Sequence, residues 1–406
     1  MPCDSNPADL IDIAQGGGVP NATLLGPVEG SPALFASNAP EQIGTGVYPP
    51  NLLKSPAPWQ LGSGPHNLFG VQLQGDDVPA RVRVFFWHVS RFDVPSYWAL
   101  LVGSNGTGGT ISNVRQIVRN VRTGLLAEIG QCLADAHLNN RLELVPGPPM
   151  PLPLEPNATE ALVFEQIAPA ESVHDKDIFQ IVAAIIEFDT TGMTELTIRS
   201  AVSLDGNYGV FGDIVNPVNN WSSETTYPAH VRGYWPHADH NLEIPAFNCR
   251  RIAPPPNFKE VQSCANPGTK AGVFSNANSL NSLNATENRA AYGANLYYKV
   301  SYFNDAPATE PTGRFYLGVR CRGTNATYFG AASLIPPGSR RQLPTIRNTG
   351  SYPRGYALTP MHRDYDSSSG SILVPPGTTT KTFRLGLAHG GGSTTPVNIL
   401  LGRDLI

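Results

Sequence analysis

Histidines and an aspartate are concentrated in one short segment, "YWPHADHNLEI" at 234–244. His237 and His240 stand three residues apart with Asp239 between them, and His230 lies just upstream. Imidazole nitrogens and carboxylate oxygens are ligands that zinc takes, and a zinc site needs three or four ligands in all. His230, His237, Asp239 and His240 therefore form the candidate metal site of this sequence.

The local sequence argues against a helical form of this site. Two histidines three apart would share a helix face, but Pro236 directly precedes them and aromatic residues flank them. On a strand, residues three apart point to opposite faces, so only a loop would bring the histidines together. No HExxH motif supplies a general base. The competing interpretation is a polar loop whose histidines hydrogen-bond locally or face solvent, and no other cofactor is predicted.

Aromatic side chains at and before the start of this segment indicate a contact surface. Tyr227, Tyr234 and Trp235 lie next to His230, and sugar-binding modules stack their ligands on exposed aromatic rings. The alternative is that these rings fill a core or the space between two domains. We expect a partner chain or a ligand such as carbohydrate at residues 227–243, or packing between domains.

The other motifs do not predict catalysis. "HGGG" at 389–392 is also the oxyanion-hole motif of esterases, where it precedes a GxSxG nucleophile elbow. This chain has no GxSxG, so a glycine turn ending the strand "TFRLGLAH" is the better interpretation. Walker A and GxGxxG motifs are absent as well. The sequence predicts a protein that is not an enzyme.

Composition favours a β-rich protein that does not bind nucleic acid. Hydrophobic residues make up 41% of the 406 residues and charged residues only 15%, with 40 glycines and 38 prolines. High glycine and proline with low charge is typical of many short strands joined by turns. The net charge is −4 and no basic run occurs, which argues against neutralisation of nucleic-acid phosphates.

The sequence shows neither a membrane-spanning segment nor the pattern of a signal peptide. No run of about 20 apolar residues occurs, so no transmembrane helix is expected. The stretch "MPCDSNPADLIDIAQGGG" lacks the basic and apolar regions of a signal peptide. Either a signal has been removed or the protein is made without one. Cys249 and Cys264 flank a proline-rich loop and could form a disulfide, with buried isolated thiols as the alternative.

Apolar periodicity predicts strands and a single helix. "ARVRVFFWHV" (80–89), "DIFQIVAAIIEFD" and "NLYYKVSYFND" are rich in β-branched and aromatic residues, as strands are. Apolar residues at helical spacing predict a helix, best supported over 124–138. The expected fold class is all-β, with two β-sandwich, jelly-roll-like domains, one short helix and an extended N-terminal arm.

The chain is expected to divide into four parts: an arm over 1–64, a first β-sandwich over 65–205, a linker over 206–224 and a second β-sandwich over 225–406. The arm is turn-rich with scattered apolar residues. Such a segment gains stability only by lying on its own domains or on a neighbouring subunit.

Three stretches carry a resemblance to a known family. They are "SPALFASNAPEQI", "FFWHVSR" followed by "YWALLVGSNGTGGTISNV", and "NLYYKVSYFNDAP" with its later Pro-Pro-Gly hairpins. In these strings and their order the chain resembles a cyanobacterial family of secreted β-rich proteins of unknown function. The resemblance implies an architecture and a cell-surface setting but no chemistry. Family members carry a signal peptide, which this sequence lacks.

Three functions are consistent with these observations. The first is a non-enzymatic structural protein, a homo-oligomer that forms a surface layer, shell or filament through β-sandwich packing, outside the cell or at its surface. The alternative is a virion structural protein, as a jelly-roll capsid, decoration or tail component, which would account for the missing signal peptide. The second alternative is a carbohydrate-binding or metal-dependent module around 227–243.

Overall fold

The structure is a computed structural model of the chain. It describes residues 6–7, 10–11, 22–38, 42–44, 59–60, 66–104, 107–123, 126–144, 151–169, 179–206, 232–252, 259–262, 291–311, 313–321, 330–335, 346–347, 355–357, 372–391 and 397–405. Within these ranges the fold is mostly β with one α-helix, α1 (Leu126–Leu138). The expected β class and the single helix are therefore confirmed.

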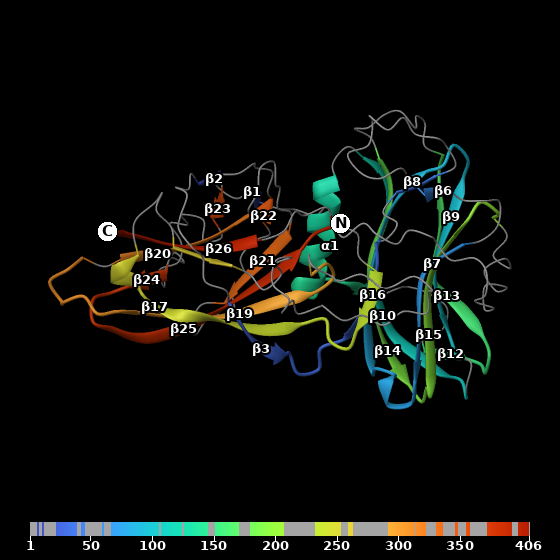
Figure 1. Ribbon diagram of the computed structural model, residues 1–406, viewed down its shortest axis with the longest axis horizontal. Helices are drawn as coiled ribbons and strands as arrows, with labels where there is room; N and C mark the ends of the chain where they lie inside the picture. Colours follow the sequence, from blue (N-terminus) through green and yellow to red (C-terminus); the bar gives the residue numbers. More distant parts are fainter. Residues whose placement is uncertain are drawn as a thin grey trace.

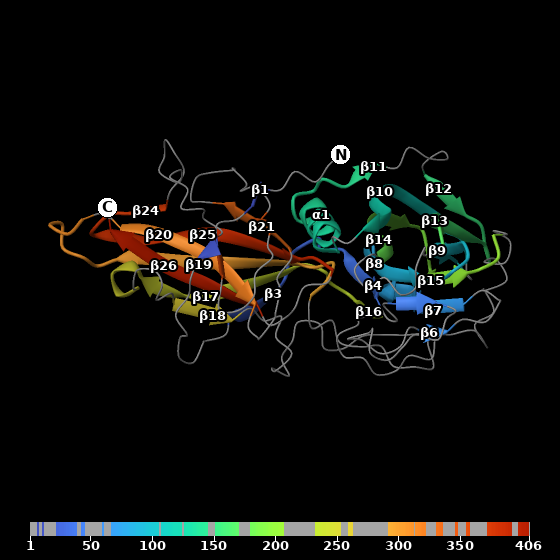
Figure 2. The same ribbon diagram turned by 90° about the horizontal axis from the view of Figure 1, so that it is seen from above.

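Two lobes lie side by side along the long axis, with α1 between them (Figures 1 and 2). The first lobe holds a nine-stranded and a four-stranded sheet. The nine-stranded sheet runs β11 (Glu143–Leu144), β10 (Gly109–Thr123), β14 (Phe179–Thr191), β8 (Arg81–Arg91), β4 (Ala33–Ser37) and β16 (Arg232–Trp235), with β12 (Leu152–Leu154), β5 (Gln42–Gly44) and β6 (Trp59–Gln60) off this path. The four-stranded sheet runs β13 (Thr159–Ile167), β9 (Ser96–Gly103), β15 (Glu195–Ser203) and β7 (His66–Gln74), and the 3₁₀ turn η1 (Gly75–Asp77) follows β7.

The second lobe holds the remaining sheets. A five-stranded sheet runs β21 (Gly330–Ile335), β25 (Thr378–His389), β19 (Asn295–Asn304), β17 (His240–Asn248) and β3 (Thr23–Pro27). A six-stranded sheet runs β18 (Lys259–Gln262), β26 (Val397–Leu405), β20 (Gly313–Cys321), β23 (Gly355–Ala357) and β2 (Leu10–Ile11), with β24 (Ile372–Val374) beside β20. A small pair joins β1 (Asn6–Pro7) to β22 (Ile346–Arg347), and the 3₁₀ turn η3 (Cys249–Arg251) follows β17.

The central strands of the first lobe are buried on both faces. Along β8, Val84 and Phe86 pack into a core shared with the four-stranded sheet, whereas Phe85 and Trp87 pack into a core shared with the second lobe. The neighbouring strand β14 alternates in the same way. This explains why both strands have nearly continuous apolar sequences, since a strand covered on both sides has no solvent face to make polar.

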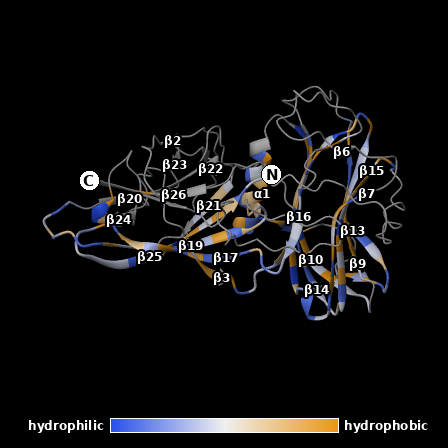
Figure 3. Cartoon of the chain, viewed as in Figure 1, coloured by the Kyte–Doolittle hydropathy of each residue, from blue (hydrophilic) through white to orange (hydrophobic). Residues whose placement is uncertain are grey.

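One apolar core crosses between the lobes. It joins Trp87 of β8 and Leu133 of α1 to Leu242 of β17, Tyr298 of β19 and Leu385 of β25. Figure 3 shows apolar residues along the strands of both lobes near α1. Because this core is continuous, separating the lobes would expose apolar surface at about 25 cal/mol per Å². The two lobes therefore form one packed unit.

Strand pairing among the described residues crosses between the ranges expected for the arm and the two domains. Strands from the arm over 1–64 enter both lobes: β3 pairs with β17, and β4 pairs with β8 and β16. Strand β16, in the range expected for the second domain, is in the nine-stranded sheet of the first lobe. Helix α1, in the range expected for the first domain, also contacts β21 and β25. The described strands of the arm pair with strands of their own chain, one of the two placements considered above.

No helix in the described part of the chain has the length and apolarity to cross a bilayer. The bonding state can be given for two of the cysteines. Cys249 is a buried thiol outside any disulfide, so the disulfide considered for Cys249 and Cys264 does not form. Cys132, on α1, is disulfide-bonded.

Candidate functional site

The segment that holds the candidate ligands joins the two lobes. Strand β16 ends at Trp235 in the nine-stranded sheet, and β17 begins at His240 in the five-stranded sheet. Residues 236–239 are the connection between them. The segment is thus strand, turn and strand, which confirms the non-helical interpretation of this sequence.

A second connection lies beside the first. Residues 28–32 link β3 in the second lobe to β4 in the first. The two connections are hydrogen-bonded to each other: the Val28 N–H donates to the Asp239 carbonyl at 2.9 Å, and the Ala238 N–H donates to the Pro32 carbonyl at 2.7 Å. The Asp239 N–H also donates to Ser31 Oγ at 2.8 Å. Two bonded connections resist a hinge motion more than one connection would.

The Asp239 carboxylate is held by an arginine of the first lobe. Arg83 on β8 donates to it twice, with Nη1 at 2.6 Å from Oδ1 and Nη2 at 3.2 Å from Oδ2. The Asn295 N–H at the start of β19 donates to Oδ1 at 3.0 Å. Asp239 therefore accepts hydrogen bonds from a strand of each lobe at once.

Arg83 has two further partners. Its Nε donates to Glu187 Oε1 on β14 at 2.6 Å, and its Nη1 also donates to the Gly293 carbonyl at 3.1 Å. Burial lowers the pKa of Arg83, but the charges of Asp239 and Glu187 more than offset this and leave the pKa above its usual value. Arg83 is 3% exposed and its guanidinium is permanently charged. Its bidentate bond to Asp239 fixes the distance between β8 and the turn before β17.

The predicted metal ligands are placed differently from one another. Asp239 is committed to Arg83, His237 is exposed in the turn, and His240 is buried at the start of β17. His230 lies outside the described residues. Within the described ranges there is no group of three or more histidine, cysteine or carboxylate side chains that could hold a metal ion. The metal site remains a prediction that depends on His230.

The environment of His240 keeps its ring neutral. Burial, together with the charge of His237, lowers the pKa of His240 to about 4, although the Ala238 backbone and Asp239 act in the opposite direction. A neutral imidazole in an apolar setting is ordinary for a buried histidine. It contributes packing at the junction rather than charge.

The aromatic residues that the sequence predicts as a contact surface are buried where the structure describes them. Tyr234 is 4% exposed in the core between the two sheets of the first lobe, and Trp235 is 3% exposed in the core between the lobes. For these two rings the packing interpretation applies. Tyr227 lies outside the described residues.

Sequence reasoning missed the two partners that give this segment its role. Arg83 interrupts the apolar strand "ARVRVFFWHV" on the same face as Phe85 and Trp87, and Glu187 lies opposite it on β14. A charged residue in phase with a buried face was the available signal. The identity of its partner 156 residues away was not readable from the sequence.

The glycines of the "HGGG" motif pack at the same junction. Strand β25 ends at His389, as the turn interpretation expects. A Cβ on Gly391 would lie 2.5 Å from the Trp87 ring, and one on Gly390 would lie 2.5 Å from the backbone of Gly130 on α1. Only glycine lets these backbones approach so closely.

Comparison with known protein-family models and with curated proteins gave no match for this chain.

Proposed function

We propose that the protein is a non-enzymatic structural subunit that self-assembles into a surface layer, shell or filament. The supporting observation is the junction between the lobes, where two hydrogen-bonded connections, one apolar core and the Arg83–Asp239 pair act together. A subunit that carries load in an assembly must transmit force without bending at a domain boundary. A junction built in this way gives that stiffness.

We interpret the first lobe as a β-sandwich. The nine-stranded and four-stranded sheets contribute side chains to one shared core, which includes Phe86 of β8, Trp98 of β9 and Ile198 of β15. Two sheets that pack face to face over a common core are the defining arrangement of a sandwich. For the second lobe, a sandwich of the five-stranded and six-stranded sheets is our proposal by the same reasoning.

The cell surface is the setting we favour. Cys132 is disulfide-bonded, and disulfides persist in oxidising compartments and are rare in the cytosol. The resemblance to secreted cyanobacterial proteins supports the same setting. A virion structural protein, folded and assembled in reducing cytosol, is the second candidate, and the Cys132 disulfide counts against it.

Sizing tests the proposal directly. Size-exclusion chromatography with light scattering over a wide concentration range, followed by negative-stain microscopy, should reveal oligomers or ordered arrays. A strict monomer at the highest concentration would overturn the proposal. Thiol titration with and without reductant distinguishes the cell-surface setting from the virion setting. A cell-surface protein isolated from its native source should contain Cys132 in a disulfide that reductant opens.

A further inference from the structure

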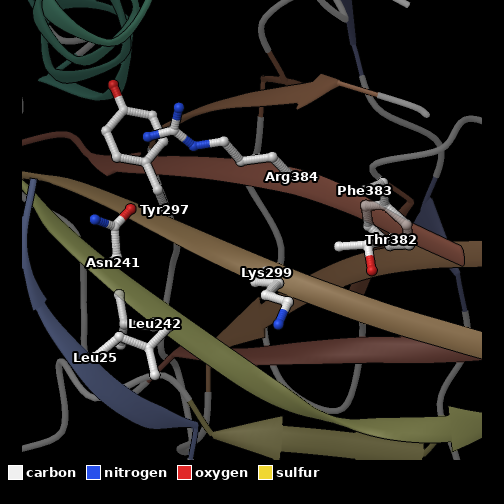
Figure 4. Close-up of a pocket in the computed structure, with 8 residues that line it drawn as sticks. All are labelled: Leu25, Asn241, Leu242, Tyr297, Lys299, Thr382, Phe383 and Arg384. Atoms are coloured by element: carbon white, nitrogen blue, oxygen red, sulfur yellow. The ribbon is translucent and has the colours of Figure 1, made fainter. Parts of the chain in front are cut away.

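The outer face of the five-stranded sheet holds a groove of about 480 Å³ near α1. Four strands line it, β3, β17, β19 and β25, and Figure 4 shows the side chains that form it. The lining residues are Leu25, Asn241, Leu242, Tyr297, Lys299, Thr382, Phe383 and Arg384, of which Leu242 and Phe383 have side chains buried in the core. The volume lies within the range of small-ligand sites, about 300–1,000 Å³.

A β-bulge places the apolar wall of this groove. The pairing of β3 with β17 matches Gly26 to Asn241 and Leu24 to Leu242, so Leu25 is the extra residue. Gly26 has a φ of 131°, a conformation that glycine tolerates. Bulges re-aim side chains next to binding sites. Leu25 is 53% exposed, an apolar surface that a ligand can cover.

Among the described residues no ion pair involves Arg384. Its guanidinium carbon lies 3.9 Å from the centre of the Tyr297 ring (Figure 4). A guanidinium stacked on a ring keeps its N–H edges available, and those edges match a carboxylate or sulfate bidentately. The stacked arginine is thus preorganised for an anion.

The other polar side chains of the groove carry no excess negative charge and supply hydrogen-bonding groups. Lys299 pairs with Glu243 at 2.9 Å, and both side chains remain substantially exposed. Asn241 and Thr382 add an amide and a hydroxyl. With the Lys299 charge balanced by Glu243, Arg384 leaves the groove a net positive charge.

We propose that this groove binds an acidic saccharide, with the sugar carboxylate on Arg384, a sugar C–H face on Leu25, and sugar hydroxyls on Asn241 and Thr382. The groove floor favours a saccharide over an acidic peptide. Peptides are commonly held through main-chain hydrogen bonds, but β17, β19 and β25 are each paired on both sides. These three strands offer the groove side chains only, and the edge strand β3 borders it through Leu25.

Calorimetric titration with a short oligogalacturonide tests this proposal, with a maltooligosaccharide of equal length as the neutral control. The acidic sugar should bind and the neutral one should not, with affinity falling as salt rises. Arg384→Gln should weaken binding by about tenfold to a hundredfold, because a charge-assisted bidentate bond is lost. Arg384→Lys, which keeps the charge but not the planar fork, should weaken binding by an intermediate factor.

Lys381→Gln is the matched control, since Lys381 is an exposed cation on the same strand that does not line the groove. It should leave affinity within about twofold. Absence of binding, equal binding of the neutral sugar, equal weakening by Lys381→Gln, or tighter binding of poly-glutamate would each overturn the proposal. Unchanged thermal unfolding of the Arg384 variants shows that they fold. The proposal is independent of self-assembly, which sizing measures separately.

Discussion

Charge has different roles on two sheets of this molecule, as a comparison of two arginines shows. Arg83, on the nine-stranded sheet, is 3% exposed and bonded to two carboxylates and a carbonyl. Arg384, on the five-stranded sheet, is exposed and stacked on Tyr297. The first sheet is covered on both faces, whereas the second leaves part of its outer face open to the groove.

The difference lies in what covers each sheet. A charge enclosed between two layers must be neutralised by its own chain, because an unpaired buried ion costs several kcal/mol. A charge on an open face is solvated and can stay available for a ligand. We therefore assign Arg83 to the junction between the lobes and Arg384 to recognition.

Removal of the buried arginine should have the largest effect. Arg83→Met leaves the buried Asp239 and the half-buried Glu187 without their cation, and should lower the free energy of unfolding by about 3–5 kcal/mol. Denaturant unfolding measures this loss. Arg81→Met on the same strand is the control: its pair with Asp189 is partly exposed, so it should cost at most about 1 kcal/mol. Equal losses would remove the distinction between buried and exposed charge.

The glycine contact at the junction should rank second. Gly391→Ala would place a methyl group 2.5 Å from the Trp87 ring and should cost about 1–3 kcal/mol through overpacking. Gly377→Ala, where the added Cβ meets nothing within 4 Å but φ is 68°, should cost only about 1 kcal/mol. Thermal unfolding of both variants compares them. A neutral Gly391→Ala would mean that the lobes are packed more loosely there.

Protonation of His240 should have the next largest effect. Unfolded His240 takes up a proton below its ordinary pKa of 6.5, but the folded ring does so only near 4. The free energy of unfolding should therefore fall as pH falls through this window. A window of about 2.5 pKa units at about 1.36 kcal/mol each sets an upper bound of about 3 kcal/mol, and we expect a loss of roughly 2 kcal/mol.

His240→Gln should remove that part of the pH dependence, measured as the difference from the unsubstituted protein between pH 4 and pH 7. An NMR titration should show the ring neutral through most of this range. A ring that titrates near 6.5 would contradict its burial at the junction.

The smallest effect is expected on the open face. Lys299→Gln removes an ion pair with Glu243 in which both side chains are more than a third exposed. It should change the free energy of unfolding by less than about 1 kcal/mol, and high salt should abolish even that difference. A larger loss would show that this face is more enclosed than the groove implies.

The sequence predicted elements better than it predicted how they combine. Local periodicity was enough for the strands around 80–89 and for the helix, because each depends on residues close in the chain. The expected domain boundaries at 64 and 225 rest on local composition. The pairing of β4 with β16, however, joins segments almost 200 residues apart. Such long-range pairing leaves no local pattern.

The candidate site shows the same limit. The spacing of the histidines suggests a metal site, yet the carboxylate between them, Asp239, makes the decisive contact. That contact needs Arg83 from β8 and Asn295 from β19, which the fold brings together. Residue types alone could not distinguish a metal ligand from an ion-pair partner.

A double-mutant cycle on Arg83 and Asp239 tests the central claim that this pair locks the lobes together. Unfolding free energies of Arg83→Met, Asp239→Asn and the double variant should give a coupling energy of about 2–3 kcal/mol, within the range for residues in one buried network. The same energies should be unchanged by added zinc or by a chelator. Coupling near zero, or stability that falls on chelation, would contradict the lock and return this segment to the metal-site hypothesis.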